Sequence, residues 1–335
     1  MSEWLVKGFI ESEQTLLLLG QPGNGKSWWI NELAIDVASG TPHLGWDVVP
    51  HSVILIDEDS TKRVVNERLH RLAKAVRVPL DQLPIACRSL SGFLLWNDSQ
   101  RQQLIHDIDQ MEKKYGRPVL VIIDSLSKVM LGFDLDKATK ATKATAYWDE
   151  LKATGATVLI VHHMSLKKPV SWQQWDITAL SMGSTMLVAG SDSALGIFRI
   201  PPREPTRFVM KPTERRFKIA LAGSVGIELI EDQDLNWARL RLLDEIPTLP
   251  SEAAKRIFPL FRDDGEELWV KTGIERVGKD LTEAEVREAL HELEREGCLE
   301  RAVEKGKAHR FKYRLHPDFK HPMSLTTEYK DELRQ

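Results

Sequence analysis

The stretch Thr15-Leu-Leu-Leu-Leu-Gly-Gln-Pro-Gly-Asn-Gly-Lys-Ser27 decides the fold that the sequence predicts. Its four consecutive leucines form an apolar run with the length of a buried strand. The residues that follow have the G-x-x-x-x-G-K-S spacing of a phosphate-binding loop at the start of a helix. Glycines let backbone N–H groups turn toward phosphates, and the helix N-terminus adds a partial positive charge. We therefore expect a nucleotide site here.

The residues of this loop have separate expected roles. Lys26 reaches the β and γ phosphates of ATP, and the Ser27 hydroxyl ligates Mg²⁺. The structural alternative is a glycine-rich turn without function, which the strand before it disfavours. The predicted nucleotide-binding residues are Gly20, Gln21, Pro22, Gly23, Asn24, Gly25, Lys26, Ser27 and Trp28.

The next apolar run, 53–56, leads directly into an acidic turn at 57–60. Ligands of open α/β sheets bind at the carboxyl ends of the strands. Glu58 is our candidate for the carboxylate that orients and activates the attacking water, because phosphoryl transfer depends on such positioning. Capping of the following helix by Asp59 or Ser60 is the structural alternative for this turn.

Two more buried strands are predicted at 119–124 and 157–161, and polar residues end both. Asp124 has the Walker B position and is the second candidate ligand of Mg²⁺. His162 and His163 follow the other strand, where adjacent side chains point to opposite faces. One histidine would face the γ-phosphate and report its presence, while the other packs inward. A pair of core histidines is the structural alternative.

Cations and tryptophans gather in two later segments. The first has the ingredients of a surface that binds a single nucleic-acid strand, although a loop packed by its own tryptophans is an equal alternative. Its candidate contact residues are Lys167, Lys168, Trp172 and Trp175. The second segment could reach a γ-phosphate in a neighbouring subunit, and surface charges on a hairpin are the alternative. Its candidate catalytic cations are Lys211, Arg215 and Arg216.

Composition restricts the class of protein. With 335 residues, 42% hydrophobic and 28% charged, the chain is typical of globular proteins with more than one domain. A formal net charge of −3 means that any nucleic-acid binding depends on local basic patches. Cys87 and Cys298 lack metal-ligand spacing and indicate a reducing compartment. No signal-peptide pattern or membrane-spanning run is visible, so we expect a cytoplasmic protein.

The C-terminal part of the sequence predicts a winged-helix domain. Helices are expected at 251–261, 270–277 and 282–296, and ribbon strands at 299–303 and 309–315. The third helix starts with a capping box and carries many glutamates, which repel DNA. The wing is basic and is the expected nucleic-acid contact, although a winged helix that docks a protein is an open alternative. Its candidate residues are Lys305, Lys307 and Arg310.

Four motifs, in this order, resemble the RecA-type ATPases of the RepA plasmid-helicase branch. They are the phosphate loop 20–27, the strand end 58–60, Asp124, and the Val-His-His-Met run 161–164. The resemblance covers roughly residues 1–243 and implies a RecA-like α/β fold with a mostly parallel sheet. It also implies a ring, expected to be a hexamer, with ATP bound between subunits and Glu58 as the catalytic carboxylate. Members of this family typically unwind DNA during replication of plasmids, phages and mobile elements.

Two departures from that family stand out. Relatives show Arg-Gly-Ser after the long loop, where this chain has Ser-Met-Gly-Ser at 181–184. The Lys-x-Arg finger of related rings is stretched over 211–216, so the identity of the finger stays open. The expected domains are an ATPase domain at 1–243, a linker at 244–250, a winged helix at 251–318 and a tail at 319–335.

The sequence therefore predicts an ATP-dependent, ring-forming replicative DNA helicase or translocase. Its expected partners are single-stranded DNA, further copies of the chain, and a primase or initiator protein. One rival is a DNA-dependent ATPase that loads or remodels without unwinding, such as a recombination mediator. Another is a KaiC-like signalling ATPase whose winged helix binds protein.

Overall fold

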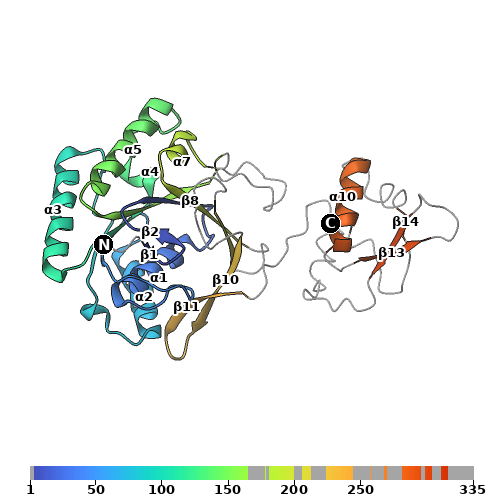
Figure 1. Ribbon diagram of the computed structural model, residues 1–335, viewed down its shortest axis with the longest axis horizontal. Coiled ribbons are helices and arrows are strands. Elements are labelled where there is room, and N and C mark those ends of the chain that lie inside the picture. The colour runs from blue at the N-terminus through green and yellow to red at the C-terminus, as the bar shows by residue number, and fades with distance from the viewer. Residues whose placement is uncertain are drawn as a thin grey trace. The chain divides into compact units, whose positions relative to one another are not determined.

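The computed structural model describes ten parts of the chain (Figure 1). They are residues 4–164, 178, 181–199, 206–212, 224–243, 257, 268–269, 281–295, 299–303 and 311–315. The chain divides into two compact units, and it passes from the larger to the smaller between Pro247 and Thr248. The predicted linker 244–250 and tail 319–335 lie outside the described residues.

A single sheet forms the centre of the larger unit. Within the described residues, nine strands lie in the order β11-β10-β9-β8-β3-β7-β6-β4-β5. The strands from β8 to β5 pair in parallel, and β8 to β11 pair antiparallel. The parallel strands are β3 (Thr15–Gly20), β4 (Ser52–Asp57), β5 (Ile85–Ser89), β6 (Val119–Asp124), β7 (Thr157–His163) and β8 (Ser193–Arg199). The antiparallel extension is β9 (Arg207–Pro212), β10 (Val225–Asp232) and β11 (Trp237–Leu242).

Helices cover both faces of this sheet (Figure 1). One face carries α1 (Lys26–Ser39) and α2 (Lys62–Ala75) together with the short strands β1 (Trp4–Val6) and β2 (Ile10–Glu11). The other face carries α3 (Asp98–Tyr115), α4 (Leu126–Val129), α5 (Ala138–Lys152) and α7 (Met186–Ala189). A 3₁₀ turn, η1 (Leu80–Gln82), precedes β5. Leu16 and Leu18 of β3 face the first layer, and Leu17 and Leu19 face the second. Burial on both faces explains why the central strands are continuously apolar.

One predicted strand is wrong over part of its length. The apolar residues of 188–200 predict a strand throughout this run, but Val188 lies in α7 and β8 begins only at Ser193. Gly190 ends the short helix at a point of close approach, because a Cβ there would lie 2.5 Å from the Thr145 side chain of α5. The apolar periodicity of so short a run does not distinguish a buried helix from a strand. Among the described helices, none has the length and apolarity needed to cross a membrane.

The smaller unit contains one described helix and three strands. The helix α10 (Glu283–Arg295) begins with the predicted capping box, in which the N–H of Thr282 donates to Oε2 of Glu285 at 2.7 Å. The N–H of Glu285 donates back to the Thr282 hydroxyl at 3.3 Å. The strands β12 (Leu268–Trp269), β14 (Phe311–Leu315) and β13 (Leu299–Val303) pair antiparallel in that order.

The helix and ribbon of the smaller unit lie where the sequence placed them, and the two-residue β12 was not predicted. The expected helix 270–277 lies outside the described residues, as does 251–261 except for Ile257. The winged-helix fold of this unit therefore stays a prediction.

Candidate functional site

The carboxyl ends of four neighbouring strands bring the predicted site residues to one edge of the sheet. In the order of the sheet, β3 ends at Gly20, β7 at His163, β6 at Asp124 and β4 at Asp57. Gly20 is paired with His163, and Asp124 with Asp57. Four segments that are separate in sequence thus meet where open α/β sheets bind their ligands.

The phosphate loop joins β3 to α1, as predicted. Gly25 adopts a left-handed conformation with φ 79° immediately before the helix, which a residue without a Cβ adopts most easily. The Lys26 ammonium donates to the carbonyl oxygens of Gly20 at 2.8 Å and Gln21 at 3.0 Å, so its side chain lies along the loop. Burial lowers the pKa of Lys26, while the charges of Asp124 and Asp59 oppose that change.

The antiparallel strands support the loop from the side. The Asn24 amide donates to the Ile197 carbonyl of β8 at 3.0 Å. The buried ring of Phe208, on β9, lies so near Gly25 that a Cβ there would be 2.8 Å from it. Sequence reasoning missed Phe208, because a single aromatic residue in a strand does not indicate that it contacts a glycine 183 positions earlier in the chain.

The two candidate Mg²⁺ ligands contact each other. The Ser27 hydroxyl donates to Oδ2 of Asp124 at 3.2 Å. The pKa of Asp124 is raised to about 7, mainly by burial and then by the nearby charges of Asp57 and Asp59, while Lys26 and the Ser27 hydroxyl oppose this change. A buried carboxylate with its ionised form destabilised in this way is suited to a cation, which removes the repulsion. A hydroxyl and a carboxylate oxygen are also the donors that Mg²⁺ prefers.

The acidic turn after β4 divides its carboxylates between different partners. Oδ1 of Asp57 accepts the N–H groups of Asp59 at 2.9 Å and Ser60 at 2.6 Å. Capping of α2 by Asp59 or Ser60 is not seen, because the helix begins after Thr61 without a side-chain cap. The Glu58 carboxylate accepts hydrogen bonds from the turn 91–93, which sequence reasoning also missed.

The two histidines at the end of β7 differ in burial. His162 is 3% exposed, and its Nε2 donates to the Met182 carbonyl at 2.9 Å. Burial lowers the pKa of His162 to about 4, with smaller contributions from His163 and Lys26, so its ring is neutral at pH 7. His163 is half-buried, and burial followed by the charge of Lys26 lowers its pKa too. The inward-facing member of the pair is therefore His162.

The remaining predicted residues are only partly described. Lys211 lies on β9, paired with Gly196. The guanidinium groups of Arg68 and Arg71 lie over the Trp28 ring, 5.8 and 5.6 Å from its centroid. The other predicted site residues, which lie outside the described residues, are Arg215, Arg216, Lys167, Lys168, Trp172, Trp175, Lys305, Lys307 and Arg310.

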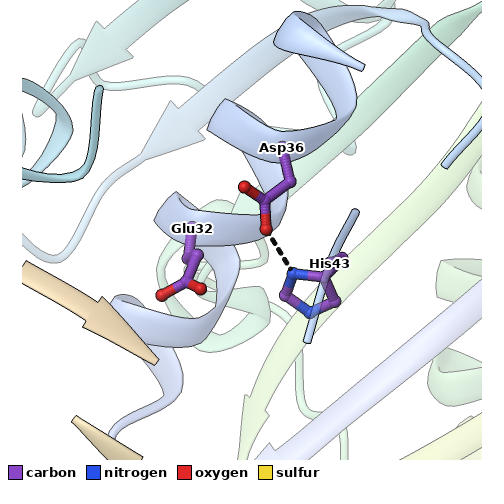
Figure 2. Close-up of side chains that lie close together, drawn as sticks. All are labelled: Glu32, Asp36 and His43. Carbon is purple, nitrogen blue, oxygen red and sulfur yellow. Dashed lines mark hydrogen bonds and ion pairs between the residues drawn. The ribbon is translucent and has the colours of Figure 1, made fainter. Parts of the chain in front are cut away.

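Helix α1 also carries a cluster of charges that sequence reasoning missed (Figure 2). Glu32, Asp36 and His43 are fully buried, and they are the group of described residues whose spacing would suit a metal ion. Nδ1 of His43 lies 2.9 Å from Oδ2 of Asp36. Arg239 of β11 pairs with both carboxylates, and Leu240 N–H donates to Glu32 at 2.6 Å. The guanidinium thus already supplies the positive charge, and we assign the cluster to the packing of α1 on β11.

The comparisons agree with this geometry. Residues 2–168 match the family model AAA_25, described as an AAA domain. This part of the chain belongs to the AAA_25 family. A solved structure titled "ATPase Domain of G40P" matches with a TM-score of 0.52 at 12% identity, covering 70% of this chain and 86% of that one. At that identity the likeness shows the fold, a RecA-like P-loop domain. No curated protein is similar enough in sequence to count as a relative.

The AAA_25 segment contains every residue of the predicted nucleotide site from Gly20 to His163. Lys26, Ser27 and Asp124 are brought together at one sheet edge within the AAA_25 domain. The chain therefore contains a P-loop ATPase domain.

Proposed function

We propose that this protein is an ATP-dependent, ring-forming replicative DNA helicase or translocase of a plasmid, phage or other mobile element. The single observation that carries the ATPase part is the contact between Ser27 and Asp124 beside the Lys26 ammonium. These three groups supply a phosphate-binding cation and two oxygen ligands for Mg²⁺ at one point. Bound Mg²⁺ would neutralise charge on the phosphates.

The other residues of the site have proposed roles in this reaction. Glu58 orients and deprotonates the attacking water, since hydrolysis of a γ-phosphate depends on positioning of the nucleophile. Lys211, Arg215 and Arg216 are candidates for a cation that completes the site of an adjacent subunit. We therefore expect Glu58→Gln to abolish turnover while nucleotide binding is retained, and ordinary hydrolysis by this variant would assign water activation to another group.

Two hydrogen bonds link the histidine pair to the end of the segment that we propose as a DNA-binding loop. His162 bonds the Met182 carbonyl, and the Met182 N–H donates back to the His163 carbonyl at 3.1 Å. Met182 follows the segment with the predicted strand-binding residues Lys167, Lys168, Trp172 and Trp175. A change at the γ-phosphate that displaces a histidine would therefore pull on the end of that segment. We propose single-stranded DNA as its ligand.

The test is a strand-displacement assay on a forked DNA duplex with the full-length chain, Mg²⁺ and ATP. We expect displaced DNA strand to accumulate when ATP is present, and we expect the Glu58→Gln variant to displace no strand. Hydrolysis that is stimulated by single-stranded DNA without displaced strand would favour the rival loader or recombination mediator. Hydrolysis that DNA leaves unchanged, together with no DNA binding at low salt, would favour the KaiC-like signalling ATPase.

Oligomeric state is a separate test of the same proposal. A ring motor places ATP between subunits, so mass measurement with ATP and single-stranded DNA should show a closed oligomer, which we expect to be a hexamer. A monomer under all of these conditions would contradict the ring. We also propose a primase or an initiator protein as the partner of the smaller unit, with its basic wing as an alternative DNA contact.

A further inference from the structure

We propose that the turn 90–93 is a latch that holds the Glu58 carboxylate in the resting site and releases it when a nucleotide is bound. The turn joins β5 to α3. This inference rests on the proposed function, because it assigns a form of control to the same carboxylate. Within it, Ser91 is a positioning residue: it acts through Glu58.

Four donors from the turn hold this carboxylate. Oε1 accepts the Ser91 N–H at 3.0 Å, the Ser91 hydroxyl at 2.5 Å and the Phe93 N–H at 3.3 Å. Oε2 accepts the Gly92 N–H at 3.0 Å. Hydrogen bonds to an ionised acceptor are about twice as strong as neutral ones, so these bonds hold the carboxylate toward the turn. A general base must instead turn a lone pair toward the proton that it removes.

The neighbouring carboxylate, Asp59, contributes instead to the electrostatics of the nucleotide site. The charge of Asp59 acts on Lys26, Asp124 and His163, and its Oδ1 lies 3.9 Å from the Lys128 ammonium. The charge of Asp59 thus acts on the nucleotide site, while the carboxylate of the preceding residue, Glu58, is bound to the turn 90–93. Activation of water by Glu58 therefore requires its carboxylate to leave those donors.

The latch can move without disturbing the core. Ser91 and Gly92 are exposed, and the Leu90 side chain is 55% exposed with a left-handed φ of 45°. Gly92 has φ 74°, and no atom lies within 4 Å of the position that its Cβ would occupy. Phe93, which is 4% exposed, anchors the end of the turn in the interior. The Leu90 N–H donates to the Asp57 carbonyl at 3.0 Å, and the Gly92 carbonyl accepts from the Gln100 amide at 3.4 Å, so movement of Ser91 and Gly92 would take place between these attachments. A hinge of this kind needs backbone rotation at a few loop positions.

A purely structural role for the same hydrogen bonds makes the opposite prediction for catalysis. If Glu58 only held the loop in place, loss of a donor would loosen the site and lower the rate. If the turn restrains Glu58, loss of a donor frees the carboxylate and raises the rate. Ser91→Ala removes the hydroxyl donor but keeps the backbone N–H groups, and Ser91→Thr keeps the hydroxyl.

The first measurement is steady-state ATP hydrolysis by the full-length chain in the absence of DNA. The latch predicts that Ser91→Ala raises kcat/KM by roughly 10-fold, the equivalent of one hydrogen bond to a charged group, and mainly through a lower KM, because less binding energy is spent on releasing the carboxylate. Gly92→Ala strains the turn and should raise kcat/KM in the same direction. Ser91→Thr and Ser99→Ala, a change on the exposed start of α3, should match the wild type. An unchanged or lower kcat/KM for Ser91→Ala in an active enzyme overturns the latch.

The second measurement separates this inference from the proposed function. Hydrogen exchange at the amides of Ser91, Gly92 and Phe93 should accelerate when the wild-type chain binds a non-hydrolysable ATP analogue with Mg²⁺. Unchanged exchange with bound analogue overturns the latch even if the enzyme is an active helicase. Accelerated exchange in a chain that never hydrolyses ATP would support the latch and contradict the proposed function. A chain that binds no analogue contradicts both.

Discussion

The Ser27 hydroxyl donates to a carboxylate oxygen of Asp124, 3.2 Å away and 97 positions further along the chain. Ser27 is the second residue of α1, the helix after β3, and Asp124 ends β6, with β7 lying between the two strands in the sheet. The contact therefore joins the phosphate loop, which follows β3, to the end of β6, and it passes the end of β7, where His163 lies. It places two oxygen ligands for one cation on different segments.

This contact predicts that the two residues act as a unit. Ser27→Ala and Asp124→Asn should each lower kcat/KM for Mg²⁺-dependent ATP hydrolysis by at least roughly 10- to 100-fold, because each removes a group that holds the metal. The double variant should lose little more than the worse single variant. Hydrolysis rates across a magnesium titration provide the measurement, and additive losses would show that the residues serve separate steps.

A second prediction concerns the packing behind the loop. Gly25→Ala should lower nucleotide affinity by roughly 10-fold or more, because a left-handed non-glycine residue costs about 1–2 kcal/mol and the Phe208 ring leaves no room. Adding Phe208→Leu should recover the steric part of that loss. Gly155→Ala is the matched control, since Gly155 has φ 86° with no atom near its Cβ position. Binding of a fluorescent ATP analogue measures all three, and equal losses for the two alanine variants would exclude the contact.

The fold could be predicted largely from the sequence, because the signals were local. Each central strand is a continuous apolar run, and α3 begins and ends where its cap residues predict, with Asn97 accepting from Gln100 and Gly116 in a left-handed conformation. The start of α1 at Lys26 follows from the loop motif alone. The error at 188–200 arose where no periodicity separates a one-turn helix from a strand.

The site was only half visible in the sequence. Lys26, Ser27 and Asp124 belong to motifs with a fixed spacing, so their roles could be expected. The partners of Glu58 are three backbone N–H groups and the Ser91 hydroxyl, and the neighbour of Gly25 is an aromatic ring. All of them lie on distant segments that carry no motif. Glu32 and Asp36 left one usable sign, since two acidic residues four apart interrupt an otherwise apolar helix. Their partner Arg239, 203 positions from Asp36, could not be identified.

The buried cluster predicts a large loss of stability for one arginine and a small one for its neighbour. Arg239→Met leaves the Asp36 carboxylate buried without its cation and should destabilise the larger unit by about 3–5 kcal/mol. Arg241→Met, on the same strand, removes a guanidinium that is 60% exposed, while its partner Glu228 keeps an ion pair with Arg207, so this change should cost at most about 1 kcal/mol. Urea denaturation compares the two, and similar losses would contradict the assigned role of the cluster.

The same cluster predicts a dependence of stability on pH. Burial raises the pKa of Glu32 from 4.5 to about 8, so the folded state holds a proton that the unfolded state releases between these values. Stability from this group is therefore complete below pH 4.5 and is lost as pH rises toward 8, by up to about 1.4 kcal/mol per pH unit. Glu32→Gln should remove this slope. Free energies of unfolding at pH 5, 6, 7 and 8 test it, and parallel curves for variant and wild type would show an ionised Glu32.

The most direct test is phosphate release from saturating Mg²⁺-ATP by the wild-type chain and by Lys26→Ala, measured side by side. If a triphosphate is held at this sheet edge, the wild type releases phosphate and the variant, without the ammonium that lies along the loop, is slower by at least roughly 100-fold. Equal rates for the two proteins, or no release by the wild type with or without DNA, would contradict the account.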